Sequence, residues 1–184
     1  MAQNATIFKV TLQVADVDRG YYHDHALTVA RHPSETDERM MVRLVAFARH
    51  AHERLAFGRG LGTDDEPDLW RKDPTGAVDL WIEVGQPDER RIRRASGRAG
   101  AVFVYPYGGR SADLWWRQAA AGLDRIANLT VAGLPSAATQ ALAKLARRTM
   151  RLDCTIQGDQ MWIADGEQAV AIEPAIWKAT PAPG

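Results

Sequence analysis

The N-terminal part of the chain alternates apolar and polar residues with a period of two, which is typical of a β-strand with one buried face. This pattern predicts a strand over Thr6–Val14 and a second strand over Tyr21–Ala30. Between them lies a turn at 16–20, where Gly20 can adopt a positive φ angle. We therefore expect the two strands to pair as a hairpin.

The spacing of apolar residues becomes helical after Pro33. Ser34 is a favourable N-cap residue, and acidic side chains follow in the next turn, where the helix dipole favours anions. Apolar residues then recur at helical spacing, which predicts a helix from Ser34 to about Glu53.

The middle of the chain alternates predicted strands and helices. The strands are expected at Leu55–Gly62, Val78–Val84, Ala101–Tyr105 and Leu129–Leu134. The helices are expected at about Asp88–Arg98 after Pro87 at the first helical position, at Ser111–Arg125, and from Pro135-Ser136 to about Ala146. Glycines alternate over 58–62, which indicates a bend or the close approach of another backbone segment.

The last third of the chain returns to β-structure. Strands are predicted at Met150–Gln157, Met161–Ala164 and Gln168–Glu173, joined by two glycine-containing turns, and the tail from about residue 179 is expected to fray. The sequence has no internal repeat and no linker. We therefore expect residues 1–184 to form one α/β domain with a mixed sheet.

Composition excludes several classes of protein. Lys+Arg and Asp+Glu both number 23, so a zero net charge excludes a histone-like polycation. The only cysteine, Cys154, rules out an intramolecular disulfide and a cysteine-based zinc site, and its apolar surroundings predict a small buried residue. There is no signal-peptide pattern and no long apolar stretch, so we expect a cytoplasmic protein that does not associate with membranes.

The predicted strand Val78–Val84 carries two acidic residues at unusual positions. Its alternating apolar residues share one face, which places Asp79 and Glu83 on the other. The helices predicted after this strand indicate that both faces are covered, so buried carboxylates need partners. Salt bridges would satisfy them, and so would a metal ion bound through oxygen. Asp79 and Glu83 lie roughly 13 Å apart along a strand, so a second metal ligand beside Glu83 should come from another element.

Two further acidic positions are candidate ligands. Glu38 lies on or beside the apolar stripe of its predicted helix, either as a partner of the helix dipole or as a site carboxylate. The acidic segment 64–68 is either a solvated turn or a second source of ligands. His23 and His25 share a face of a predicted strand, but no third zinc ligand is evident, and we expect surface histidines.

The helix predicted after Pro87 is rich in arginine. Arg91, Arg94 and Arg98 line one outer stripe beside the strand end that carries Glu83. Such a stripe can bind phosphates bidentately, or it can be a solvated face with acidic neighbours.

Several strings of the sequence are specific enough to indicate a family. They are TVARHPSET at 28–36, ERM at 38–40, DEP at 65–67 with LW at 69–70, WIEVGQPD at 81–88 and RTM at 148–150. Together they closely resemble the YaeQ family from Ala5 to about Trp177. The resemblance implies a fold similar to the PD-(D/E)XK nuclease superfamily: a restriction-endonuclease-like α/β (α+β) fold, with a mixed sheet flanked by helices and additional N- and C-terminal strands.

The resemblance also implies a site. In the superfamily, a helix carboxylate, an Asp and a (D/E)-x-K strand bind Mg²⁺ or Mn²⁺, and the Lys orients the attacking water. Here the metal-binding carboxylates would be Glu38, Glu83 and a preceding Asp, for which the possible residues are Asp79, Asp65 and Asp68. Pro67-Asp68 also repeats the letters PD.

This sequence departs from the superfamily pattern at the lysine, where it has Gly85. If Gly85 forms a bulge, Gln86 would take over the orientation of water. The expected catalytic residues are thus Glu83, Gln86 and Glu38, and Arg91, Arg94 and Arg98 would bind a nucleic-acid backbone. The alternatives are a non-catalytic module that binds nucleic acid or protein on the same fold, and a carboxylate cluster retained only for folding.

Overall fold

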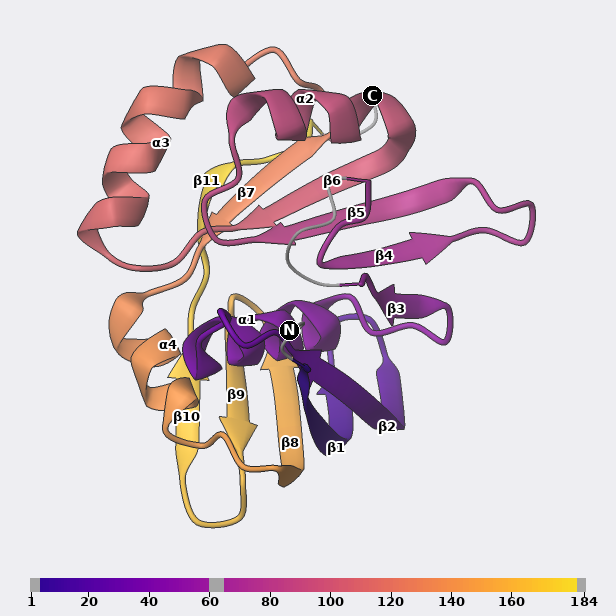
Figure 1. Cartoon of the computed structure of the whole chain (residues 1–184), viewed down its shortest axis with the longest axis vertical. Helices are drawn as coiled ribbons and strands as arrows, with labels where there is room; N and C mark the ends of the chain where they lie inside the picture. The colour runs from indigo at the N-terminus through magenta and orange to yellow at the C-terminus, as the bar shows by residue number, and fades with distance from the viewer. Residues whose placement is uncertain (1–3, 60–64, 182–184) are drawn as a thin grey trace. The chain divides into compact units, whose positions relative to one another are not determined.

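The structure is a computed structural model that describes residues 4–59 and 65–181 of the chain. The chain divides into two compact units, each built from separate segments of the sequence. Unit 1 comprises Met1–Ala51 and Ala137–Pro174, and unit 2 comprises His52–Ser136 and Ala175–Gly184. The described residues form a mixed α+β structure with two mixed sheets and four helices (Figure 1).

Unit 1 contains a five-stranded sheet with the order β10-β9-β8-β1-β2. The bounds are β1 (Thr6–Asp16), β2 (Tyr21–Arg31), β8 (Thr149–Gln157), β9 (Gln160–Ala164) and β10 (Ala169–Ile172). The predicted hairpin β1–β2 and the predicted C-terminal meander are both confirmed. They are joined by a parallel pairing of β1 with β8, in which Leu12 lies opposite Leu152.

The helix α1 (Asp37–Arg49) packs on this sheet, where Phe47 meets the ring of His25 edge-on at 5.1 Å between centroids. Its predicted start is wrong. The N-cap is Thr36, whose hydroxyl accepts a hydrogen bond from the Arg39 backbone N–H at 3.1 Å, while the Ser34 hydroxyl lies 2.6 Å from His32 Nδ1. The helix also ends at Arg49, with His50 as its C-cap, and does not continue to Glu53.

Unit 2 contains a six-stranded sheet with the order β11-β7-β6-β5-β4-β3. The bounds are β3 (Leu55–Phe57), β4 (Leu69–Lys72), β5 (Val78–Val84), β6 (Ala99–Tyr105), β7 (Leu129–Gly133) and β11 (Ala175–Lys178). β5, β6 and β7 are parallel, and the other pairings are antiparallel. The strand predicted over Leu55–Gly62 is too long: β3 ends at Phe57, and Gly58 and Arg59 follow it outside any strand. The rest of the predicted strand, 60–62, lies outside the described residues.

The helices α2 (Glu89–Arg98) and α3 (Arg110–Leu123) cover one face of the six-stranded sheet. Ile92 and Ala95 of α2 join Trp81, Val102 and other residues of the sheet in one apolar cluster. The prediction that β5 is covered on the face of Trp81 and Glu83 is therefore confirmed. Helix starts are shifted from their predicted positions: Pro87 precedes the N-cap Asp88, and α3 begins after Gly109.

We expected a mixed sheet with additional N- and C-terminal strands, and the described strands form two mixed sheets. The additional N- and C-terminal strands form the five-stranded sheet through the β1–β8 pairing. β11 was not predicted, because it is only four residues long and follows the β-meander directly after Pro174. The last helix, α4 (Ser136–Ala143), follows β7 as expected, although it is shorter than predicted. Over residues 4–59 and 65–181, no helix is long and apolar enough to cross a membrane.

Candidate functional site

Glu83 lies near the end of β5 and is almost completely buried, with 3% of its surface exposed. β4 and β5 are antiparallel, and the pairing of Leu69 with Ile82 brings Asp68 level with Glu83. Asp68 is buried as well, at 6% exposure, and its Oδ2 accepts a hydrogen bond from the Val84 backbone N–H at 2.8 Å. Unit 2 thus places two buried carboxylates side by side at one end of a β-hairpin.

A close backbone approach holds the segment before β4 in place. The Gly58 backbone N–H donates to the Asp68 carbonyl at 2.9 Å. A Cβ atom at Gly58 would lie 1.9 Å from the Pro67 carbonyl oxygen, so only glycine fits there. The close approach that the alternating glycines predicted is confirmed at this position, and its effect is to fix Pro67-Asp68 beside β5.

Three neighbours set the charge of Glu83. Its Oε1 accepts hydrogen bonds from Trp81 Nε1 at 2.9 Å and from Arg91 Nε at 2.7 Å. Burial, followed by the charge of Asp68, raises the pKa of Glu83 to about 7, against the opposing effect of Arg91 and of these hydrogen bonds. The second negative charge therefore makes ionisation of Glu83 costly, and a nearby cation favours it.

The other two candidate aspartates of the sequence analysis lie elsewhere in unit 2. Asp79 is at the opposite end of β5, its side chain is 37% exposed, and its carboxylate lies 3.7 Å from Arg71 Nε. Asp65 lies in an exposed turn before Asp68. Of the three aspartates, Asp68 is the one beside Glu83. The sequence analysis left the three aspartates open, and the β4–β5 register is what places Asp68 opposite Glu83.

Gly85, at the lysine position of the superfamily pattern, has a φ angle of +89°. A side chain there would be strained, so this backbone favours glycine over lysine. Gln86 is exposed, and its Nε2 donates to the Ser111 hydroxyl at 2.9 Å and more weakly to the Tyr107 carbonyl at 3.4 Å. Both hydrogen bonds use the amide nitrogen of Gln86. Its amide oxygen is the atom that would accept a hydrogen bond from water.

The arginine stripe on α2 contains two kinds of residue. Arg91 is partly buried and contacts Glu83, and its Nη2 also donates to the Glu66 carbonyl at 2.8 Å. Arg94 and Arg98 are exposed, and the Arg98 guanidinium lies over the Trp81 ring at 5.5 Å from its centroid. We expected the stripe to lie beside Glu83, and Arg91 is the residue of the stripe that contacts it.

Glu38 belongs to unit 1, where it occupies the first turn of α1. Its Oε1 accepts a hydrogen bond at 2.8 Å from the hydroxyl of Thr139, a fully buried residue of α4. This bond links the two helices of unit 1. It gives the carboxylate a structural partner that the sequence pattern did not indicate.

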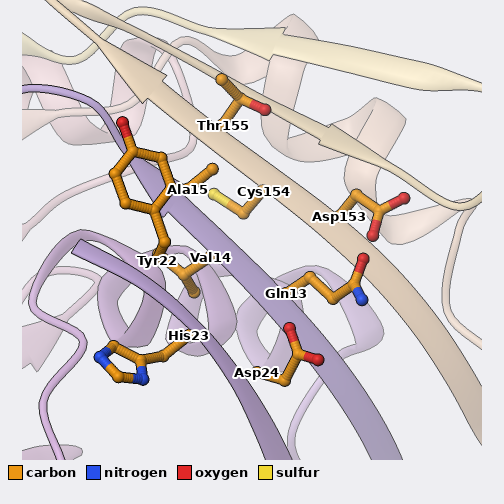
Figure 2. A pocket seen from close by; sticks show the side chains of 9 residues that line it. All are labelled: Gln13, Val14, Ala15, Tyr22, His23, Asp24, Asp153, Cys154 and Thr155. Atoms are coloured by element: carbon orange, nitrogen blue, oxygen red, sulfur yellow. The ribbon is translucent and has the colours of Figure 1, made fainter. Parts of the chain in front are cut away.

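A pocket in unit 1 lies over the five-stranded sheet and combines polar side chains of three strands (Figure 2). Gln13 of β1 lies between Asp24 of β2 and Asp153 of β8 in the strand register. Cys154 also lines it but is buried, as predicted, and burial raises the pKa of its thiol to about 12. The thiol is therefore protonated at neutral pH and a poor nucleophile.

Asp68 and Glu83 offer carboxylate oxygens, the type of donor that small divalent cations bind together with water and phosphate. Mg²⁺ is often held by one or two carboxylates together with substrate phosphates. Asp68 and Glu83 supply two carboxylates, and a cation would relieve their mutual repulsion. In the part of the chain that the structure describes, no group of three or more His, Cys, Asp or Glu side chains is arranged to hold a metal ion.

Comparisons with known proteins agree over nearly the whole chain. The chain is 45% identical to the uncharacterised protein YaeQ of Salmonella typhi and 44% identical to that of Escherichia coli (strain K12), in each case over 97% of this chain and 98% of the relative. Among solved structures, the YaeQ protein of Xanthomonas axonopodis pv. citri matches with a TM-score of 0.92 at 50% identity, covering 95% of this chain and 99% of that one. The YaeQ protein of Pseudomonas syringae matches with a TM-score of 0.91 at 36% identity, covering 95% of this chain and 97% of that one. Residues 1–174 match the family described as "YaeQ protein", and the chain belongs to this family.

Proposed function

We propose that this chain is a Mg²⁺- or Mn²⁺-dependent nuclease that hydrolyses phosphodiester bonds, with Asp68 and Glu83 as its metal-binding carboxylates. The observation that carries the proposal is the pairing of these two buried carboxylates at one end of the β4–β5 hairpin. A hairpin with Pro-Asp before one strand and Glu near the end of the next has the order of the PD-(D/E)XK pattern. The restriction-endonuclease-like core would then be the six-stranded sheet of unit 2 with α2 and α3.

The residues around the pair have distinct roles in this proposal. When bound, a divalent cation would neutralise negative charge on a phosphate and make water a better nucleophile. Gln86 would orient water through its amide oxygen, because an amide cannot act as a base. Arg94 and Arg98 would bind the phosphate backbone from the exposed side of α2.

Calorimetric titration of Mn²⁺, with and without a DNA oligonucleotide, tests the proposal. We expect saturable binding to the wild type that is lost in Glu83→Ala and in the isosteric Asp68→Asn. Asp79→Asn is the matched control and should bind like the wild type, because Asp79 lies at the other end of β5. No Mn²⁺ binding to the wild type under either condition would refute the proposal, and so would loss of binding only in Asp79→Asn.

A non-catalytic nucleic-acid-binding module is the second candidate. Two observations favour it: Arg91 already neutralises Glu83, and Gly85 stands where the superfamily has lysine. Such a module would bind DNA or RNA without metal, with an affinity that decreases as salt increases. If Glu83→Ala changes only the stability of the protein, the carboxylate pair serves folding alone and the nuclease proposal loses its support. The binding module is then tested by substitution of the arginines of α2.

A further inference from the structure

Arg91 makes a charged contact with Glu83 of the Asp68–Glu83 pair. Its Nε donates to Glu83 Oε1 at 2.7 Å, and its Nη2 donates to the Glu66 carbonyl at 2.8 Å. One guanidinium therefore links β5 to the segment just before Asp68. It supplies a positive charge at the place where the proposed function requires a divalent cation.

A divalent cation and this guanidinium compete for the same carboxylate. Glu83 Oε1 already accepts from Arg91 and from Trp81 Nε1. Direct coordination of a cation through that oxygen would weaken both hydrogen bonds, and it would place two positive charges against each other in a buried site where screening is weak. Metal binding therefore favours a state in which the Arg91 side chain has moved away from Glu83.

The position of Arg91 permits this movement without opening the core. The Arg91 side chain is 23% exposed, whereas that of Glu83 is 5% exposed. The Arg91 backbone N–H bonds to the Asp88 cap at 2.8 Å, so the helix start is held independently of the guanidinium. Arg94 and Arg98 lie on the exposed side of the same helix. A guanidinium that leaves a carboxylate can bind a phosphate with the same planar fork.

We infer that Arg91 couples metal binding to phosphate binding: its guanidinium neutralises Glu83 in the metal-free protein and transfers to a phosphate of the nucleic acid when the cation binds. This inference rests on the proposed function and adds a regulation of the same site. Because coupling between binding sites is reciprocal, phosphate bound by Arg91 raises the affinity for metal, and metal raises the affinity for phosphate.

The test compares Mn²⁺ affinities by calorimetry in the absence of DNA. Arg91→Gln removes the competing cation, and we expect it to tighten Mn²⁺ binding about tenfold, within the usual range of coupling between sites. Arg117→Gln is the matched control, since it removes an equal charge from an exposed position on α3. Its affinity should stay within about twofold of the wild type, because an exposed charge is largely screened.

A second experiment repeats the Mn²⁺ titrations in the presence of a duplex DNA oligonucleotide. The DNA should strengthen Mn²⁺ binding to the wild type by a larger factor than to Arg91→Gln, in which the coupling residue is missing. If Arg91→Gln does not fold, Arg91→Lys replaces it, because lysine keeps the charge but lacks the fork that reaches both Glu83 and Glu66. We expect its Mn²⁺ affinity to lie above that of the wild type.

The outcomes separate this inference from the proposed function. Mn²⁺ binding to Arg91→Gln that equals the wild type, or is weaker, would overturn the coupling and leave the metal site standing. An equal gain in Arg117→Gln would also overturn it, because the effect would then be one of general charge. Absence of Mn²⁺ binding in the wild type and all variants, with or without DNA, would overturn the proposed function itself.

Discussion

Glu83 shows how neighbours set the charge of a single side chain. In the unfolded chain its carboxyl has the ordinary pKa of 4.5, and in the folded protein burial and Asp68 raise the pKa to about 7. Between these two values the folded state holds more protons than the unfolded state. The contribution of Glu83 to the free energy of unfolding is therefore fully present below pH 4.5. It is lost as the pH rises through about 7.

We predict that Glu83→Gln abolishes this part of the pH dependence. In the metal-free wild type, the shift corresponds to a loss of about 3 kcal/mol in the free energy of unfolding between pH 4.5 and pH 8. Glutamine keeps the acceptor for Trp81 and Arg91 but does not titrate. Urea denaturation with a chelator present, at a series of pH values, measures the difference between the two proteins.

The control for this prediction is Glu89→Gln on α2. Glu89 pairs with Arg93 at an exposed position, so its replacement should leave the pH profile of the wild type unchanged. A profile for Glu83→Gln that follows the wild type would show that other groups cause the pH dependence.

At the residue scale, the sequence indicated that Glu83 is a buried carboxylate, but it left its acidic neighbour open among Asp65, Asp68 and Asp79. The alternation of β5 places Glu83 on a covered face, and a buried carboxylate needs a partner, so both points followed from local pattern. The choice of Asp68 over Asp65 and Asp79 depended on which residue of β4 lies opposite Ile82. That register comes from the pairing of two strands, and the sequence of β5 alone does not contain it.

Helix α1 is the element whose start differs most clearly from the prediction. Ser34 and Thr36 are both good N-cap residues, and the acidic residues that follow suit either start. Glu35 between them is buried and forms two hydrogen bonds with Arg43, at 2.9 and 2.5 Å. Because Arg43 of the helix holds the carboxylate of Glu35, Glu35 stays before the first helical turn. Thr36 is therefore the N-cap residue.

We therefore predict that the two caps respond differently to substitution. Thr36→Ala removes the acceptor for the Arg39 backbone N–H and should lower the free energy of unfolding by about 1 kcal/mol. Ser34→Ala removes only an exposed contact with His32 and should change it by less than about 0.5 kcal/mol. Chemical denaturation of both variants measures the difference, and a larger loss for Ser34→Ala would contradict the observed helix start.

At the scale of the whole molecule, zero net charge gives no general attraction to nucleic acid. Any affinity must then come from local groups, and α2, which carries Arg91, also carries the exposed Arg94 and Arg98. Each arginine that contacts a phosphate contributes about one unit to the slope of log affinity against log salt.

We predict that the double substitution Arg94→Gln with Arg98→Gln reduces this salt slope by about two units. Fluorescence anisotropy with a labelled oligonucleotide, in chelator, would give the slope. Arg117→Gln, an exposed arginine of α3, is the matched control and should leave it unchanged. An equal reduction in the control would place the nucleic acid elsewhere than along α2.

The sequence by itself determined what depends on local periodicity: the β1–β2 hairpin, the covered strand β5, the helix α2 and the burial of Cys154. These follow because each is decided by residues close together in the chain, as is the family membership carried by short strings. The tertiary structure alone decided the parallel pairing of β1 with β8, the division of the strands between two sheets, the short strand β11 and the contacts of Asp68 and Arg91 with Glu83. The physical reason is that these contacts join residues far apart in sequence, and their register depends on how the whole chain returns to bury its apolar faces.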